Sequence, residues 1–229
     1  RKATLSKRLR MSFAGQTTFV FIPGKNWRLS LAELVSFLEA REYKFELREF
    51  TKAFFTVDID DGLSASAIVD LGGTIKIGRL ATCISTKTIE EAFLQKDKLA
   101  QAQVKLSLSS SGIVDGMLEA SARKSVFGVS VYCAEQTFYP VSKAMQRFLG
   151  SSLKRELASH GRKSGFMGFP KQRWQPQLSH VEVLKKNLVE RNAEILFCIG
   201  KKQTYFSTTI AVHNPFEFQK RDVGRPVQR

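Results

Sequence analysis

The first 86 residues alternate between strand-like and helix-like patterns, and this alternation restricts the folds that are open to the chain. Residues 17–22 (TTFVFI) form the β-branched and aromatic run that is typical of a buried strand. Ser30, with Glu33 three residues later and leucines at helical spacing beyond it, predicts the start of a helix. Residues 44–50 alternate in polarity and residues 53–59 are largely apolar, which indicates two strands joined by a short turn.

A short helix and another strand complete this first unit. Residues 63–71 predict a short helix of small residues, and residues 74–84 (TIKIGRLATCI) predict a strand. The predicted order is therefore β-α-β-β-α-β, the ferredoxin-like arrangement, in which helices cover one face of an antiparallel sheet. We expect an α+β protein whose first domain spans residues 17–86, after a basic tail at residues 1–16.

The rest of the chain predicts a second α/β domain, over residues 87–214. Its long helix, at residues 141–160, ends before Gly161, a residue suited to the left-handed position that follows many helices. Ser179 and Glu182 have the capping-box spacing and predict another helix, which extends to about residue 190. The remaining predicted elements are helices at 89–106 and 114–122, and strands at 127–133, 194–199 and 204–212.

The positive charge of the chain is concentrated in two places. The formal net charge is +15, of which residues 1–10 contribute +5 without a single acid. Residues 140–229 hold 17 Lys and Arg against 6 Asp and Glu, or +11, and the 129 residues between these two regions sum to −1. A field this strong on one half of a protein points to a polyanionic partner, most often a nucleic acid.

The basic half also carries a pattern that is typical of RNA binding. On the predicted helix at residues 141–160, Lys143, Arg147 and Lys154 fall within about 40° of one another, opposite the apolar residues. The loop at residues 162–177 interleaves cations, which bind phosphate oxygens, with aromatic rings, which stack on unpaired bases. A solvated helix face and aromatic rings packed into the core remain the alternatives. The candidate RNA-binding residues are Lys143, Arg147, Lys154, Arg155, Arg162, Lys163, Phe166, Phe169, Lys171, Arg173, Trp174, Lys185 and Lys186.

The sequence contains no recognisable catalytic or metal site. Residues 68–73 (IVDLGG) look like a cofactor-binding glycine loop, but strand periodicity continues directly after them, which favours a tight turn. Asp58, Asp60 and Asp61 lack the ligand spacing of a calcium loop, and the three histidines have no metal-site partners in sequence. No Walker loop, GxSxG or HExxH motif occurs, so we predict no catalytic residue, no cofactor and no metal in this chain.

The cysteines and the lengths of the apolar runs indicate in which cellular compartment the protein is expected. Cys83, Cys133 and Cys198 are scattered through strand-like apolar segments without a CxxC pair, which predicts buried, reduced thiols and a cytoplasmic protein. No apolar run approaches the roughly 18–20 residues of a membrane span. The basic start is not followed by a signal-peptide apolar run, so we expect no membrane partner.

The second half of the chain resembles a known family. At residues 127–212, the order of strand, long basic helix, basic loop, second helix and closing strands resembles a THUMP domain, whose usual companion in RNA-modifying enzymes is a ferredoxin-like unit. Residues 178–200 and 208–229 look like the passage that leads into the catalytic domain of THUMP-containing tRNA guanine-N2 methyltransferases. The AVQ…RDYGRP type of sequence in that family is matched by residues 211–213 (AVH) and 221–226 (RDVGRP).

This resemblance implies a tRNA-binding module that engages the acceptor 3′ end of its partner. It also implies a methyltransferase domain in the complete protein, which would bind S-adenosylmethionine and to which residues 215–229 form the linker. The chain departs from the family pattern because no cofactor loop and no Asp/Asn-Pro-Pro-Tyr/Phe motif follow. Two alternatives stay open: the same module in a tRNA thiolation or pseudouridylation enzyme, and a non-enzymatic basic protein that binds an acidic partner or a membrane surface.

Overall fold

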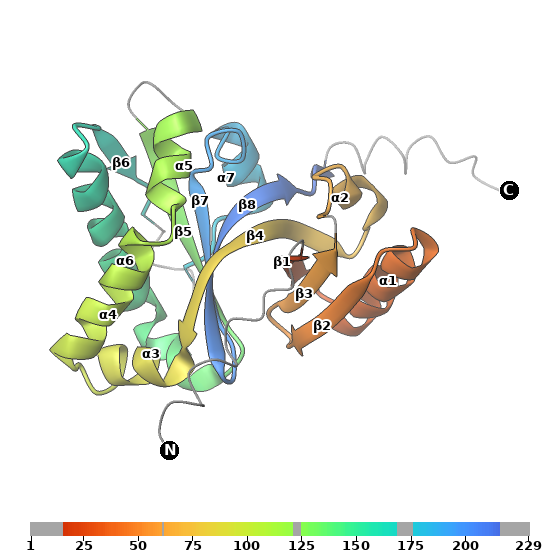
Figure 1. Ribbon diagram of the computed structural model, residues 1–229, viewed down its shortest axis with the longest axis horizontal. Helices are drawn as coiled ribbons and strands as arrows, with labels where there is room; N and C mark the ends of the chain where they lie inside the picture. The colour runs from red at the N-terminus through yellow and green to blue at the C-terminus, as the bar shows by residue number, and fades with distance from the viewer. Residues whose placement is uncertain (1–15, 61, 121–124, 169–175, 216–229) are drawn as a thin grey trace, which may run out of the picture.

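A single eight-stranded sheet runs through the residues that the computed structural model describes, which are 16–60, 62–120, 125–168 and 176–215 (Figure 1). The strands lie in the order β2-β3-β1-β4-β8-β7-β5-β6. Neighbouring strands are antiparallel, except that β5 runs parallel to both β6 and β7. The strands are β1 (Gln16–Pro23), β2 (Phe45–Phe50), β3 (Phe55–Asp60), β4 (Thr74–Ser85), β5 (Ser125–Cys133), β6 (Ser164–Phe166), β7 (Glu194–Ile199) and β8 (Gln203–Val212).

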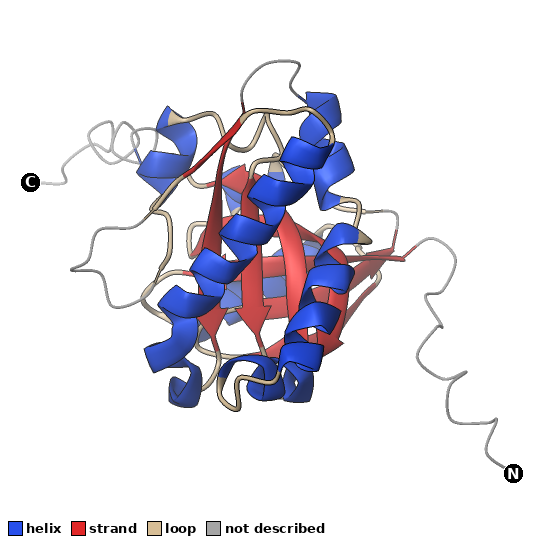
Figure 2. Ribbon diagram, turned by 90° about the vertical axis from the view of Figure 1, so that its left-hand side faces the viewer, coloured by secondary structure: helices blue, strands red, loops and turns tan. Residues whose placement is uncertain are grey.

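Helices connect these strands, so the chain is a mixed α and β protein. The α-helices of the described residues are α1 (Trp27–Ala40), α2 (Ala67–Asp70), α3 (Thr86–Phe93), α4 (Lys98–Ser109), α5 (Ile113–Ala120), α6 (Tyr139–Ser159) and α7 (His180–Lys185), and a 3-10 turn, η1 (Gln136–Phe138), precedes α6. In Figure 1, α1 and α2 lie beside β1 to β3, while α3, α4, α5 and α6 gather at the opposite end of the molecule. Figure 2 shows the long helices of this second group crossing one face of the sheet.

The first six elements follow the predicted β-α-β-β-α-β order, with their strands arranged as β2-β3-β1-β4. The sheet then continues into the second half of the chain, because β4 pairs with β8 from Lys76↔Val212 to Ser85↔Gln203. Strands from both of the expected domains therefore belong to one sheet.

Two apolar cores lie between the sheet and its helices. Each forms because apolar residues alternate along the strands and recur at helical spacing on the covering helices. The core below α1 and α2 includes Phe19, Phe21, Leu34, Leu38, Val57 and Ile59. The core below α3 to α6 includes Val104, Met117, Val129, Val131, Leu149, Leu153 and Phe197.

A third core lies on the other face of the strands, without a covering helix from either group. On β1 it takes Val20 and Ile22, and on β7 it takes Leu196 and Cys198, which alternate with residues of the two helix-covered cores. Gly78 of β4 permits this packing, because a Cβ atom there would lie 2.7 Å from Leu196 Cδ1. The sheet therefore brings the back faces of its two halves into contact.

The start of α1 differs from the prediction. The helix begins at Trp27, where the Asn26 side chain accepts a hydrogen bond from the Leu29 N–H at 3.4 Å. Ser30 lies inside the first turn and is buried, and its hydroxyl donates to the Gly73 carbonyl at 2.7 Å. The predicted capping serine therefore ties α1 to the turn before β4.

Other helices are shorter than predicted. The helix expected at 89–106 is two helices, α3 and α4, because Lys96 adopts a left-handed backbone (φ 60°) and Asp97 caps α4 through the Ala100 N–H at 2.7 Å. Only residues 67–70 of the segment 63–71 are helical. The capping box of Ser179 and Glu182 is present, as predicted, but α7 stops at Lys185. Gly161 follows α6 in the predicted left-handed conformation, at φ +70°.

Candidate nucleic-acid interface

Helix α6 presents a cationic surface that its own amphipathic pattern produces. Met145, Leu149 and Leu153 are buried against the sheet, because they recur at intervals of four residues and so lie on one side of the helix. The cations occupy the rest of the circumference, where Arg147, Lys154 and Arg155 are exposed and Lys143 is half-buried. We call the four side chains Lys143, Arg147, Lys154 and Arg155 the α6 cationic face.

Few acids oppose this charge nearby. Residues 140–168 contain six Lys and Arg but a single acid, Glu156. That carboxylate accepts a hydrogen bond from Ser109 on α4 at 3.1 Å. Over the described ranges of the chain, the ion pairs include none of Lys154, Arg155 or Lys163. A surface with this charge excess attracts anions such as phosphate.

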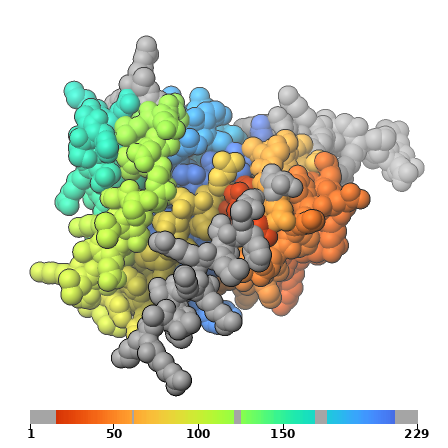
Figure 3. Space-filling view, in the orientation of Figure 1, coloured from red at the N-terminus to blue at the C-terminus, as the bar shows by residue number. Residues whose placement is uncertain are grey.

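A small pocket continues this surface at the C-terminal end of α6. It has a volume of about 440 Å³, and Lys154, Arg162, Lys163 and Ser164 contribute to its lining. The hydroxyl of Ser164 is buried and has no hydrogen-bond partner among the described residues. In Figure 3, the teal atoms of this region stand at the upper left, away from the orange surface of α1 and β2. The structure thus brings Arg162 and Lys163, predicted from the loop, beside Lys154 of the helix.

Phe166, another predicted RNA-binding residue, is used in packing. Its ring lies 5.4 Å from the ring of Phe127, centre to centre, and it packs against the core below α6. Gly150 on α6 makes room for the ring, since a Cβ atom at that position would overlap it. The ring is half-buried, and its contact with RNA stays a prediction.

The remaining predicted residues lie elsewhere. Lys185 and Lys186 are exposed at the end of α7, on a different element from the α6 cationic face. Phe169, Lys171, Arg173 and Trp174 lie outside the described residues. Their predicted contacts are therefore untested.

A groove on the back of the sheet was not predicted from the sequence. Its volume is about 1090 Å³, and its walls come from the β1–α1 connection, the β2–β3 turn, the end of β5, the start of α6 and the start of α7. Trp27, Phe50, Lys52, Tyr139, His180 and Lys201 are among its lining residues. These six positions are spread over 175 residues in five segments without a shared motif, so no local pattern indicates that they meet.

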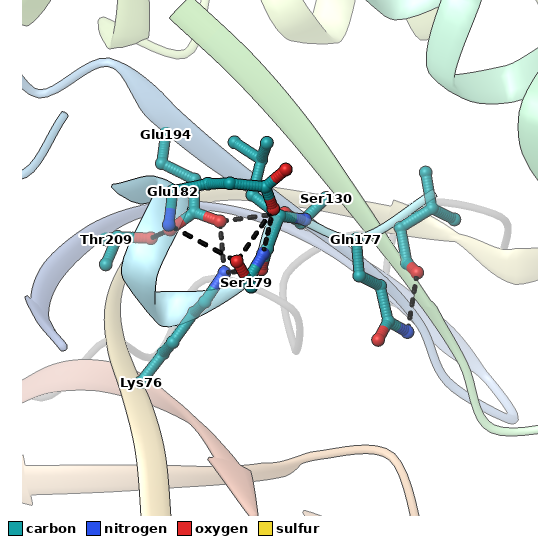
Figure 4. A network of polar contacts seen from close by, with 9 residues as sticks. Lys76, Ser130, Gln177, Ser179, Glu182, Glu194 and Thr209 are labelled. Carbon is teal, nitrogen blue, oxygen red and sulfur yellow. Dashed lines mark hydrogen bonds and ion pairs between the residues drawn. The ribbon is translucent and has the colours of Figure 1, made fainter. Parts of the chain in front are cut away.

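A buried polar network lies under the groove (Figure 4). Lys76 of β4 lines the groove and forms an ion pair with Glu194 of β7. The Lys76 ammonium also donates to the Leu178 carbonyl at 2.8 Å. Glu194 accepts hydrogen bonds from Ser130 and Thr209, each at 2.7 Å. Because buried charges are costly unless they are paired and hydrogen-bonded, this network holds the floor of the groove in one arrangement.

Several titratable groups near the groove are shifted toward their neutral forms. Burial, together with repulsion from His213 and Lys76, lowers the pKa of His180 below its usual 6.5, so His180 is neutral at pH 7. Burial raises the pKa of the Cys198 thiol and of the Tyr132 phenol, and it raises the pKa of Cys133 to about 12. Cys133 and Cys198 are buried as predicted, but Cys83 is exposed, because it points outward from the far end of β4.

The Gly72-Gly73 turn, which looks like part of a cofactor loop, is closed by a side chain of α1. The Glu33 carboxylate accepts hydrogen bonds from the Gly72 and Gly73 N–H groups at 2.8 and 2.7 Å. Thr74 then begins β4, so no helix N-terminus follows the glycines. A cofactor bound at this turn would need the same two N–H groups, and the Glu33 carboxylate already occupies them.

The described residues contain neither a metal-binding cluster nor a membrane-spanning helix. No group of three or more His, Cys, Asp or Glu side chains is arranged to hold a metal ion there. Across the same described ranges, no helix is long and apolar enough to cross a membrane.

The chain matches no protein-family model and no curated protein. It is similar to the solved structure of PH1313 from Pyrococcus horikoshii Ot3, with 12% identity and a TM-score of 0.47, over 84% of this chain and 54% of that one. It is also similar to a predicted N6-adenine-specific DNA methylase from Listeria monocytogenes, with 10% identity and a TM-score of 0.44, over 85% of this chain and 40% of that one. A possible methylase from Clostridium difficile 630 has 11% identity and a TM-score of 0.39, with coverages of 85% and 41%.

The chain thus spans about half the length of the first of these structures and two fifths of the other two. All three TM-scores lie below 0.5, so these likenesses carry no argument about function. A proposal about function therefore rests on the residues of this chain.

Proposed function

We propose that this chain is the tRNA-binding part of an S-adenosylmethionine-dependent tRNA methyltransferase. In this proposal, residues 17–86 form a ferredoxin-like domain and residues 87–214 form a THUMP domain. The chain holds the acceptor 3′ end of a tRNA, and a methyltransferase domain, to which residues 215–229 lead, modifies a guanine elsewhere on the molecule. The proposed partner is tRNA, and the proposed location is the cytoplasm.

The observation that carries the proposal is the joint cationic surface of α6 and the pocket at its end. Exposed Lys154, Arg155 and Lys163 without ion-pair partners among the described residues can bind phosphates at little desolvation cost. The surface lies on a rigid helix that packs on the sheet, which suits a surface that must hold RNA in one orientation.

The arrangement of the first half supports the domain assignment. The order β2-β3-β1-β4, with α1 and α2 over one core, is compatible with a ferredoxin-like unit. The order of β5, α6, α7, β7 and β8 along the chain agrees with the resemblance to a THUMP domain.

The role of the chain in this proposal is positional. Its cations bind backbone phosphates, which fixes the register of the RNA, and the distance to the modified nucleotide then follows from the shape of the tRNA. S-adenosylmethionine would supply the methyl group from the catalytic domain. The Gly72-Gly73 turn does not suit it, because Glu33 occupies the N–H groups of both glycines.

Binding of the chain to an intact tRNA and to the same tRNA without its single-stranded 3′ end tests this proposal. We expect tighter binding to the intact tRNA and a steep dependence on salt. With about four phosphate contacts, a fourfold rise in salt should lower the affinity on the order of a hundredfold. A flat salt response, or equal affinity for both RNAs, would contradict the proposal.

A further inference from the structure

The groove on the back of the sheet has the chemistry of a site for unpaired nucleotides. Its volume of about 1090 Å³ is at the upper end of the range for ligand sites, roughly 300–1,000 Å³, so it has room for bases. Trp27, Phe50 and Tyr139 supply aromatic rings, and Phe50 is 57% exposed. An exposed ring in a concave wall is a surface on which a base can stack.

The charges of the groove suit an anionic chain. Lys52 lies in the β2–β3 turn and Lys201 in the β7–β8 turn, and both are exposed. Among the described residues that line the groove, none is an acid. His180 is neutral at pH 7 because of its lowered pKa, so it can offer a hydrogen bond to a base without adding charge. Cations at the rim and rings within are the combination found in proteins that bind single strands.

The groove and the α6 cationic face share one element, the helix α6. Tyr139, which lines the groove, is the first residue of α6, and Lys143 follows one turn later on a neighbouring side of the helix. From Tyr139 to Lys154 the helix advances about 22 Å. One RNA strand can therefore contact the groove and the helix at the same time.

The predicted RNA-binding loop joins the same two places at its described ends. At its start, Phe166 packs beside Gly150 of α6. At its end, the Pro176 carbonyl accepts a hydrogen bond from the Val131 N–H at 2.9 Å, and Gln177 lines the groove. The described start of the loop therefore lies beside α6, and its described end lies at the groove.

We infer that the groove binds unpaired nucleotides at the end of an RNA whose paired part lies on the α6 cationic face. This inference rests on the proposed function and adds a second site to it. Lys52 and Lys201 contact the phosphates, while Phe50 and Trp27 stack on bases. A duplex keeps its bases stacked inside, so only an unpaired segment can make the ring contacts.

The test compares two hairpin RNAs with the same stem, one blunt and one with a four-nucleotide 3′ overhang. Fluorescence anisotropy measures the affinity of the full chain for each RNA. The groove variant carries Phe50→Ser, Lys52→Gln and Lys201→Gln, all at exposed positions, so we expect it to fold. The control variant carries Lys96→Gln and Lys98→Gln, which remove two exposed cations, one just before α4 and one at its first residue.

We expect the wild-type chain to bind the overhang RNA more tightly than the blunt RNA. The groove variant should lose on the order of a hundredfold in affinity for the overhang RNA, as expected for one lost base stack and two lost phosphate contacts, and should bind the blunt RNA almost as the wild type does. The control variant should keep the preference for the overhang. Photo-cross-linking from 4-thiouridine in the overhang should label peptides that contain residues 27 or 50–52.

Several results would overturn the inference. If the groove variant keeps the full preference for the overhang, or loses equal affinity for both RNAs, the groove is not the site. If the wild-type chain binds both RNAs equally, the recognition of an unpaired 3′ end fails, and both the proposed function and the inference fail with it, whatever the salt dependence. If the wild-type chain binds neither RNA, the proposed function fails and the inference fails with it.

Discussion

The ammonium group of Lys76 on β4 is buried against the carboxylate of Glu194 on β7, with side-chain exposures of 1% and 0%. Lys76 belongs to the first of the two expected domains and Glu194 to the second. The pair therefore adds a side-chain connection to the backbone pairing of β4 with β8. Because Lys76 also holds the Leu178 carbonyl, it fixes the end of the predicted RNA-binding loop and the start of α7.

We predict that Lys76→Met destabilises the protein by about 3–5 kcal/mol, since it leaves the Glu194 carboxylate buried without a counter-charge. Urea unfolding followed by circular dichroism measures this change. The double variant Lys76→Met and Glu194→Gln should recover part of the loss, because no buried charge remains. A cost below 1 kcal/mol for Lys76→Met would show that the pair is not buried in solution as it is in the structure.

The contact between Gly150 and Phe166 gives a second prediction. Gly150→Ala places a methyl group in the space of the Phe166 ring and should destabilise the protein by about 1–3 kcal/mol. Gly116→Ala in α5 is the matched control, because the nearest atom to its Cβ would be 3.8 Å away, on Asn192. That substitution should be neutral or stabilise the protein by up to about 1 kcal/mol. Thermal unfolding of the two variants decides the sign of each effect.

Much of the fold could be predicted from the sequence because its strands carry strong local patterns. Residues 19–22 and 195–199 are continuous apolar runs, and both lie within strands of the structure. The helix ends were harder to predict, because long-range contacts set them. Ser30, for example, has the sequence of a cap, yet its hydroxyl bonds to Gly73, 43 residues away.

The candidate site likewise has one part that follows from a local sequence pattern and one part that depends on long-range contacts. The α6 cationic face could be predicted because its members recur at helical spacing within one element. The groove could not, since Trp27, Phe50 and Lys201 come together only through the pairing of distant strands. The packing role of Phe166 depends on a glycine of another element, Gly150, and no local pattern shows that the two positions meet.

The exposed thiol leads to a third prediction. Cys83 is exposed, although partial burial raises the pKa of its thiol. Cys133 and Cys198 are buried, which raises the pKa of Cys133 to about 12 and the pKa of Cys198 well above its usual value. At pH 8 a thiol reagent such as 5,5′-dithiobis(2-nitrobenzoate) should therefore react rapidly with one thiol of the folded chain and with three after unfolding. Cys83→Ser should abolish the fast reaction. Rapid labelling of two or more thiols in the native protein would contradict the placement of Cys133 and Cys198.

The same raised pKa values predict a loss of stability in alkali. In the unfolded chain the two thiols ionise near their usual pKa of 9.0, whereas the folded chain keeps them protonated to higher pH. The folded state therefore binds more protons above about pH 9, and the free energy of unfolding should fall as the pH rises beyond that point. Urea midpoints at pH 8 and pH 10 measure the effect. The variant Cys133→Ala and Cys198→Ala should show a weaker dependence on pH.

The cations of α6 and of the pocket at its end give the last prediction, which separates a binding role from a structural one. Replacing Lys154, Arg155 and Lys163 together by Gln removes three exposed charges without ion-pair partners among the described residues. If each charge contacts one phosphate, the slope of log affinity against log salt for tRNA should become shallower by about three. The midpoint of thermal unfolding should change little, because exposed charges contribute little stability. The Lys96→Gln and Lys98→Gln variant serves as the control and should retain the wild-type slope. A lower unfolding midpoint with an unchanged salt slope would instead assign these cations to the fold and not to RNA.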